Sequence, residues 1–241
     1  MFLYIRLILA HFIGDFPLQF DKLYALKFKK ITGVVLHTLI IFACLILFSW
    51  PYLTRWNLWV FLTLIALTHF VQDWAKIKFT RQSKHNLFFF VLDQVLHVSL
   101  LATLFLTDLK NGQPPLNNNN NALIALYNSD FVCLYITAII VSSYIGYFII
   151  LIFKRDYLKK ENPDNSFERK YGFIERFSIT SALLVEGLSP LLIPLILAVR
   201  PLLSRTMKEK LGLSSQFASW TEILLSGAFS ILTGLIFYTF I

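Results

Sequence analysis

The stretch Leu67-Thr-His69-Phe-Val-Gln-Asp73-Trp-Ala-Lys76 lies inside an apolar segment that extends over residues 58–78. A helix of this length, rising 1.5 Å per residue, can cross a hydrocarbon core about 30 Å thick. The segment nevertheless carries a histidine, an aspartate and a lysine, and a charged side chain at the centre of a bilayer costs ~2.5–3.5 kcal/mol. The stretch therefore predicts a transmembrane helix that contributes to a polar site.

The composition of the whole chain is that of an integral membrane protein. Hydrophobic residues make up 56% of the 241 residues, and only 15% are charged, against roughly 25% in soluble domains. A soluble protein of this length could not bury so much apolar surface. The net charge of +8 is attributed to basic cytoplasmic connections, not to nucleic-acid binding. Cys44 and Cys133 lie in separate apolar runs and predict neither a disulfide nor a metal pair.

Seven apolar stretches predict an all-α, polytopic bundle of transmembrane helices. They cover residues 2–20, 31–50, 58–78, 86–107, 131–153, 173–200 and 219–241. The first has no small-residue cleavage site, so we expect a permanent span and not a signal peptide. Lysine and arginine concentrate after the first, third and fifth stretches, which predicts cytoplasmic connections there and an N-terminus outside.

The stretches predict three parts of the chain. Residues 1–107 are expected to form a four-helix transmembrane bundle, and residues 131–241 a second transmembrane half. Between them, residues 108–130 contain a run of asparagines and predict a polar external loop. No part is long enough for a soluble catalytic domain, so any chemistry is expected in the membrane or at its surface.

The sixth stretch is longer than one straight span requires. Its middle contains Gly187, Pro190 and Pro194, and such residues interrupt helical hydrogen bonding. The basic residues that follow it belong on the cytoplasmic side. We therefore expect a broken or re-entrant segment over residues 173–203, with a single long tilted helix as the alternative.

Three of the first four stretches carry a histidine and an aspartate four residues apart, which places both on one helix face. The pairs are His11–Asp15, His69–Asp73 and Asp93–His97. The order reverses in the fourth stretch, which runs in the opposite direction, so every pair places its aspartate nearer the cytoplasm. The histidines are expected up to ~15 Å deep. The second stretch adds His37, and four helices packed with these faces inward would form one cluster.

Imidazole and carboxylate ligands together suit zinc, manganese or non-haem iron. Facing helices of a bundle hold such ions through pairs of ligands. The predicted ligands of one or two divalent ions are His11, Asp15, His37, His69, Asp73, Asp93 and His97. A structural role is the alternative for each of them, because a membrane histidine often bonds to a neighbouring helix and a His–Asp pair can satisfy itself. Three pairs matched in direction and depth favour a functional cluster.

Further polar residues lie near the same layer of the membrane. Asp73, Asp93 and Lys76 are the predicted catalytic residues, and Gln19, Lys76 and Gln94 the predicted substrate contacts of the first half. Pro17 deprives the carbonyl of Ile13 of its helical donor. The first helix is therefore expected to open beside the site.

The second half carries fewer indications of chemistry. Glu175, Arg176 and Arg200 are the predicted substrate contacts there. An arginine fork can bind a phosphate or a carboxylate in bidentate fashion, and snorkelling of Arg176 to the interface is the alternative. Glu186 is expected near freed backbone groups at the break of the sixth stretch, and Glu222 at the membrane interface.

The segments AHFIGDFPLQ (10–19), LTHFVQDWAK (67–76) and LDQVLH (92–97), together with His37, resemble a bacterial inner-membrane family described as domain of unknown function 3307. GFIER (172–176) and VRPLLSR (199–205) are similar to the second half of that family. The resemblance implies a multi-pass protein of the bacterial cytoplasmic membrane. It supports the choice of site residues and implies no reaction, since the family has no established activity.

The leading hypothesis is a metal-dependent hydrolase that acts on a lipid or isoprenoid ester or phosphoester, with metal-activated water as the nucleophile. Lys76, Arg176 and Arg200 would neutralise a phosphate. The expected partner is a membrane lipid or lipid-linked small molecule, not nucleic acid, and the oligomeric state stays open. The rivals are a divalent-cation or proton transporter using the same cluster, a bundle binding haem between two histidines, and a structural membrane subunit.

Overall fold

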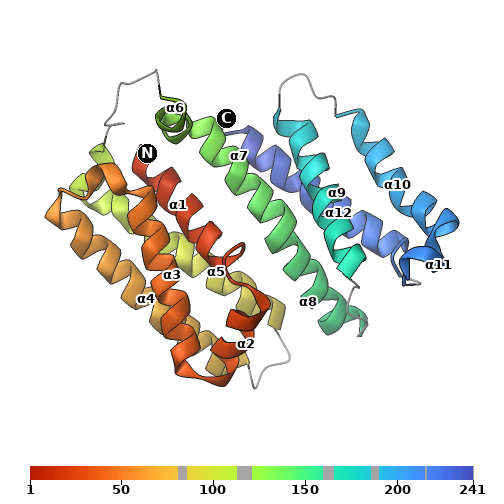
Figure 1. The fold of residues 1–241 in the computed structure, drawn as a ribbon, viewed down its shortest axis with the longest axis horizontal. Coiled ribbons are helices and arrows are strands. Elements are labelled where there is room, and N and C mark those ends of the chain that lie inside the picture. Colours follow the sequence, from red (N-terminus) through yellow and green to blue (C-terminus); the bar gives the residue numbers. More distant parts are fainter. Residues whose placement is uncertain (81–85, 113–120, 160–165, 186–189, 215, 241) are drawn as a thin grey trace. The chain divides into compact units, whose positions relative to one another are not determined.

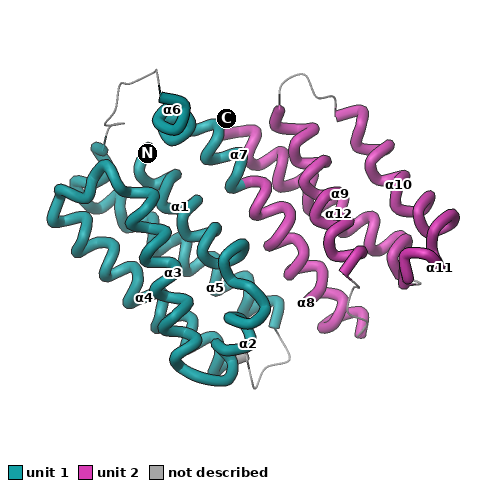
Figure 2. Tube along the Cα trace, viewed as in Figure 1, with its two compact units in different colours: residues 1–137 teal, residues 138–241 magenta. Residues whose placement is uncertain are grey.

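The structure, a computed structural model, describes residues 1–80, 86–112, 121–159, 166–185, 190–214 and 216–240. All regular secondary structure in these ranges is helical, which confirms the predicted all-α class (Figure 1). The chain divides into two compact units, Met1–Thr137 and Ala138–Ile241 (Figure 2).

Five of the described helical segments are long and apolar enough to cross a membrane. They are Ile31–Phe48, Trp56–Phe79, Asn86–Leu106, Asp130–Leu158 and Trp220–Tyr238. These segments indicate a membrane protein by their length and composition. The count of seven segments, the orientation and the bacterial inner membrane stay predictions.

The first unit is built from four long helices, and shorter helical segments connect them. Its elements are α1 (Phe2–Asp15), α2 (Asp21–Lys29), α3 (Ile31–Phe48), η1 (Trp50–Tyr52), α4 (Trp56–Thr80), α5 (Asn86–Ala102), η2 (Thr103–Leu106), η3 (Asp108–Asn111), α6 (Ala122–Asn128) and the first part of α7 (Asp130–Ile140). Helix α3 packs against α1, α2 and α4, and α5 packs against α1 and α4. Leu7, Ile41, Leu45, Leu62 and Leu101 lie in the apolar core between them.

Helix α1 ends earlier than its apolar stretch. Its last residue is Asp15, two positions before Pro17, and the amide of Leu18 donates to the carbonyl of Ile13 at 3.0 Å. The helix therefore ends before Pro17 as expected, but the carbonyl of Ile13 is not left free, because Leu18 replaces the missing donor. The chain turns into α2, a helix within residues 21–30, which we expected to be a connection.

The second unit contains the rest of α7, a π-helical turn, and α8 to α12. The elements that follow α7 are η4 (Val141–Ile145), α8 (Gly146–Leu158), α9 (Ser166–Leu184), α10 (Leu192–Thr206), α11 (Lys208–Leu211) and α12 (Trp220–Tyr238). Helix α9 packs along α12, where Gly234 allows close approach to Leu183. The sixth stretch is thus divided between α9 and α10. Its expected break at Gly187 and the asparagines of residues 117–120 lie outside the described residues.

Candidate metal centre

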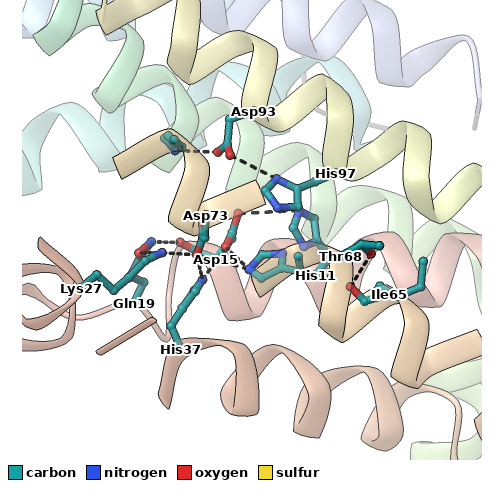
Figure 3. A network of polar contacts seen from close by, with 12 residues as sticks. His11, Asp15, Gln19, Lys27, His37, Ile65, Thr68, Asp73, Asp93 and His97 are labelled. Atoms are coloured by element: carbon teal, nitrogen blue, oxygen red, sulfur yellow. Dashed lines mark hydrogen bonds and ion pairs between the residues drawn. The ribbon is translucent and has the colours of Figure 1, made fainter. Parts of the chain in front are cut away.

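The four long helices of the first unit bring all seven predicted ligands to one place. Helix α1 contributes His11 and Asp15, α3 contributes His37, α4 contributes His69 and Asp73, and α5 contributes Asp93 and His97. All of them except His69 are labelled in Figure 3. The exposed fraction of each residue lies between 0% and 5%. The four-residue spacing within α1, α4 and α5 places each pair on one inward face.

Asp15 connects three helices at the centre of this cluster. Its Oδ1 lies 2.9 Å from Nε2 of His37 and 3.8 Å from Nε2 of His69. Its Oδ2 lies 3.7 Å from Nε2 of His11 on the same helix. One carboxylate therefore faces imidazoles from α1, α3 and α4.

Asp73 occupies an equivalent position on α4. Its Oδ2 lies 3.5 Å from Nε2 of His37 and 3.6 Å from Nε2 of His69. His37 and His69 therefore lie between the two carboxylates of Asp15 and Asp73. The ring centroids of these two histidines are 5.3 Å apart.

The third His–Asp pair approaches the same histidines from α5. Nδ1 of His97 lies 3.6 Å from Oδ1 of Asp93. The ring of His97 is 4.3 Å from that of His69 and 5.1 Å from that of His11, measured between centroids. The three pairs therefore form one continuous cluster.

The donor atoms fit a metal ion. Three triads place one ligand atom of each member within 4.8 Å of the others: His11–Asp15–His69, His37–His69–Asp73 and Asp73–Asp93–His97. Two ligands about 2.1 Å from a tetrahedral ion are about 3.4 Å apart, close to the 3.5–3.8 Å between these imidazole and carboxylate atoms. Nε2 of His11, Nε2 of His69 and both ring nitrogens of His97 have no hydrogen-bond partner among the described residues. Buried histidines of this kind could hold a metal, because their lone pairs are otherwise unused.

Two lysines reach the carboxylates from the edge of the cluster. Nζ of Lys76 lies 2.6 Å from Oδ2 of Asp93, and Nζ of Lys27 lies 2.6 Å from Oδ2 of Asp73. The predicted catalytic lysine is therefore in contact with a predicted ligand. Lys27 was not identified as a site residue from the sequence, because it belongs to a predicted basic connection. The four-residue spacing of Leu23 and Lys27 could have indicated its burial, because it places both residues on one face of a helix, and both are buried in α2.

The charges of the cluster nearly balance. The three carboxylates face the two ammonium groups of Lys27 and Lys76, which leaves one uncompensated negative charge when the four imidazoles are neutral. A bare charge in a membrane interior is costly. The cluster therefore favours a further cation.

Two amides complete the surroundings. Nε2 of Gln94 donates to Asp15 Oδ2 at 3.3 Å and to Asp93 Oδ2 at 3.1 Å. Nε2 of Gln19 donates to the carbonyl of Asp15 at 2.7 Å, and its Oε1 accepts from Lys27 at 2.9 Å. The structure thus brings Gln19, Lys76 and Gln94 to the cluster, and their contact with a substrate stays a prediction.

The other three predicted substrate contacts meet in the second unit. Arg200 binds Glu175 in bidentate fashion, with Nε to Oε2 at 2.9 Å and Nη2 to Oε1 at 2.8 Å. Ser226 also donates to Glu175 Oε1, at 2.6 Å. Arg176 is 3% exposed, so it does not snorkel, and its Nη2 donates to the carbonyl of Ser143 at 3.2 Å. Ser143 belongs to the π-helical turn η4, a backbone form that is frequent at functional sites.

Glu222 is buried within its unit, and its level at the membrane interface stays a prediction. It forms an ion pair with Lys154, and its Oε2 lies 3.7 Å from Nη1 of Arg200. Sequence reasoning missed Lys154 and Ser226 as members of this network. The four-residue spacing of Glu222 and Ser226 on α12 was the available signal. Glu186 lies outside the described residues.

Fold and cluster define a class: helical membrane proteins with a buried histidine–aspartate centre. The sequence pattern of the family described as "Protein of unknown function (DUF3307)" matches residues 3–123, half of the chain. The chain belongs to this family, as the resemblance implied. The matched region contains the whole cluster, including Lys27 and Lys76. No curated protein and no solved structure was found to match the chain.

Proposed function

We propose that the His/Asp cluster binds one divalent metal ion and that the protein is a metal-dependent hydrolase of a lipid or isoprenoid ester or phosphoester. The observation that carries the proposal is the convergence of four imidazoles and three carboxylates in a buried layer, with several ring nitrogens unpartnered. Bound zinc lowers the pKa of a coordinated water to ~7, so a hydroxide nucleophile becomes available at neutral pH.

The charge count favours one ion over two. One divalent ion changes the net charge of the cluster from one negative to one positive, and a bound hydroxide would neutralise it. Two ions would leave an excess of three positive charges in a site whose residues are at most 5% exposed. His69 and Asp73 each belong to two of the three triads, so they are the ligands we expect in any arrangement.

The edge of the cluster supports a reaction over a closed structural site. The side chain of Lys76 is 27% exposed, and its ammonium contacts Asp93. Asp93 would accept a proton from the nucleophilic water, and Lys76 would neutralise an anionic substrate that approaches from this edge. In this assignment the three predicted catalytic residues keep separate roles. Asp73 is a metal ligand, Asp93 is the general base and Lys76 binds the anionic substrate.

Transport of a divalent cation or of protons is the second candidate. The observation in its favour is that Asp73 and Asp93 already form ion pairs with lysines. An entering ion must compete with these internal cations, and such competition is a means of coupling ion binding to a conformational change. Haem ligation between neighbouring histidines is disfavoured for the pairs His11–His69, His11–His97, His37–His69 and His69–His97, since ring centroids 4.3–5.6 Å apart leave no space for a porphyrin between them.

Elemental analysis of the protein purified in detergent without chelator tests the metal. We expect about one zinc, manganese or iron per chain in the wild type and a loss of most of it in His69→Ala. Asp108→Asn is the matched control, because Asp108 is an exposed acid outside the cluster, and it should keep the metal. Metal-free wild-type protein that neither gains an ion nor gains stability on titration with these metals would refute the site.

Reconstitution in liposomes separates hydrolysis from transport. A hydrolase releases headgroup or acyl product from labelled lipid esters, and Asp93→Asn should reduce the rate by ~10²–10⁴-fold if Asp93 is the general base. A transporter instead moves the metal ion or protons across sealed vesicles, and Asp93→Asn abolishes the flux. Flux without product release would replace the hydrolase proposal by the second candidate.

A further inference from the structure

A basic pocket opens beside α2, at one end of the first unit. It has a volume of about 200 Å³ and is lined by residues of α2, the start of α3 and the last turns of α4. Four of the lining residues are lysines: Lys27, Lys29, Lys30 and Lys78. None of the described residues that line it is acidic.

The rest of the lining is apolar. Ile31, Trp74 and Ile77 contribute to the wall, and Ile31 and Trp74 are 54% and 40% exposed. The ammonium of Lys78 lies 3.6 Å from the ring centroid of Trp74, which is the geometry of a cation–π contact. The pocket therefore combines positive charge with apolar surface, which suits an anion that carries hydrocarbon.

The position of the pocket along the helices also matters. It lies where the candidate span Ile31–Phe48 begins and the candidate span Trp56–Phe79 ends, which is where these spans are expected to meet the membrane surface. The N-terminus of α3 receives no side-chain cap from Lys30, and the amide of Gly33 donates to the carbonyl of Lys30 at 3.0 Å. The positive end of the α3 helix dipole adds to the attraction of an anion at this level.

We propose that this pocket binds the anionic headgroup of a membrane lipid, with the phosphate among the lysines and the hydrocarbon along Ile31 and Trp74. A volume of about 200 Å³ holds a phosphate and its neighbouring glycerol but not the acyl chains, which stay in the bilayer. A free phosphate ion is also an anion but would make no use of the apolar wall.

Lys27 links the pocket to the His/Asp cluster. It lines the pocket, and its ammonium lies 2.6 Å from Oδ2 of Asp73. Figure 3 shows it on the same side of the cluster as Gln19 and His37. The pocket does not depend on a metal. Only the step from bound lipid to substrate rests on the proposed function, and it would make an anionic lipid the substrate class of that site.

The test uses the full chain in nanodiscs and the fluorescence of Trp74. Brominated phosphatidylglycerol should quench this tryptophan at a lower mole fraction than brominated phosphatidylcholine. The difference between wild type and Trp74→Phe isolates its signal from the other tryptophans, and the ratio of the two lipids removes any change in its intrinsic emission.

Two matched triple variants decide whether the pocket or the general charge of the protein is responsible. Lys29→Gln, Lys30→Gln and Lys78→Gln together should reduce the preference for phosphatidylglycerol by at least about tenfold, because each lysine near an anionic surface contributes to lipid binding. Lys22→Gln, Lys110→Gln and Lys208→Gln remove the same charge from exposed positions outside the pocket and should leave the preference unchanged. An equal loss in both variants would overturn the proposal.

Inorganic phosphate separates the two sources of the anion. At about 10 mM and constant ionic strength it should not displace the brominated lipid. Full displacement would overturn the lipid assignment in favour of a free phosphate site. Metal content is measured in parallel: the pocket variant should keep its metal, so a failure of the lipid site and a failure of the metal site are distinguishable.

Discussion

The ammonium of Lys27 lies 2.6 Å from Oδ2 of Asp73, and both side chains are buried. Lys27 comes from α2, a helix that is not among the candidate membrane spans. Because α2 packs against α3, it carries a cation into a cluster whose other residues come from α1 and from the candidate spans α3, α4 and α5. This short helix therefore takes part in the electrostatics of the site.

Replacement of Lys27 by methionine should destabilise the metal-free protein by ~3–5 kcal/mol, because the carboxylate of Asp73 then stays buried without its cation. Saturating metal should recover most of this loss, since the ion supplies the missing positive charge. Denaturant unfolding with and without chelator measures both values. Lys22→Met, at an exposed position of the same helix, should have little effect. A loss that is the same with and without metal would argue against an ion beside Asp73.

Lys76 should behave differently from Lys27. Its side chain is 27% exposed against 7% for Lys27, so water can solvate Asp93 when the lysine is removed. We expect Lys76→Met to cost no more than ~1–2 kcal/mol of stability while reducing turnover of an anionic lipid substrate at least tenfold. Unfolding and product release measured on one preparation check this. A stability loss as large as that of Lys27→Met would contradict the partly exposed position of Lys76.

Gly33→Ala tests the close packing of α2 on α3. A Cβ atom at this position would lie 2.4 Å from the carbonyl carbon of Leu26 and 2.5 Å from the amide nitrogen of Lys27. Backbone must then move, which should cost ~2–3 kcal/mol and weaken metal binding by displacing Lys27.

Gly227→Ala is the matched control, because its Cβ would meet only the side chain of Leu197, at 3.3 Å. It should cost less than ~1 kcal/mol. Thermal unfolding of both variants provides the comparison. Equal stabilities would show that α2 is not held against α3 in this way.

Removal of one partner of the buried Glu175–Arg200 ion pair should destabilise the protein more than removal of both. Either Glu175→Leu or Arg200→Leu alone should destabilise the protein by ~3–5 kcal/mol, since each leaves the partner's charge buried. The double variant should recover much of this loss, because no unpaired charge remains. A double-mutant cycle in detergent measures the coupling. Additive losses would mean that Ser226 and the carbonyl of Phe217, which also contact the pair, satisfy each partner independently.

Tyr127 predicts a change of stability at high pH. Its hydroxyl donates to the carbonyl of Phe48 at 2.9 Å, and burial raises its pKa above the ordinary value, although Arg6 partly opposes the shift. The protonated form is thus favoured by folding: its contribution is fully present below the unfolded pKa of ~10 and is lost as the pH rises through the higher folded pKa.

Tyr127→Phe should cost about 1 kcal/mol at neutral pH and flatten the decline in unfolding free energy above pH ~10. Denaturant unfolding at several pH values between neutrality and about 11 gives both curves. Parallel curves for the two proteins would show that another group causes the alkaline decline.

Much of the site was predictable because its pattern is local. The pairs His11–Asp15 and His69–Asp73 share a helix face whatever the neighbouring helices do, since the period of the α-helix alone decides it. The end of α1 before Pro17 is local as well, because it follows from the missing amide hydrogen. Predictions of this kind need only the residues within one or two turns.

Other features depended on packing. Lys27 belongs to a basic run that predicts a cytoplasmic connection. The close contact of α2 with α3 at Gly33 brings it to Asp73. Arg200 binds Glu175 of its own unit, a contact that the sequence did not indicate, and its contact with a substrate stays a prediction. Glu222 is buried beside Lys154, a partner that the sequence did not indicate. Their partners are distant in the sequence, where no short-range pattern identifies them.

The sequence by itself determined that this is a helical membrane protein with His–Asp pairs on the inner faces of its first helices. Hydropathy and helical periodicity are properties of single segments, and they need no partner. The tertiary structure decided which atoms meet: that Asp15 and Asp73 share His37 and His69, and that Lys27 completes the cluster. Those contacts depend on how helices pack and on where each one begins and ends, and so on interactions between residues far apart in the chain.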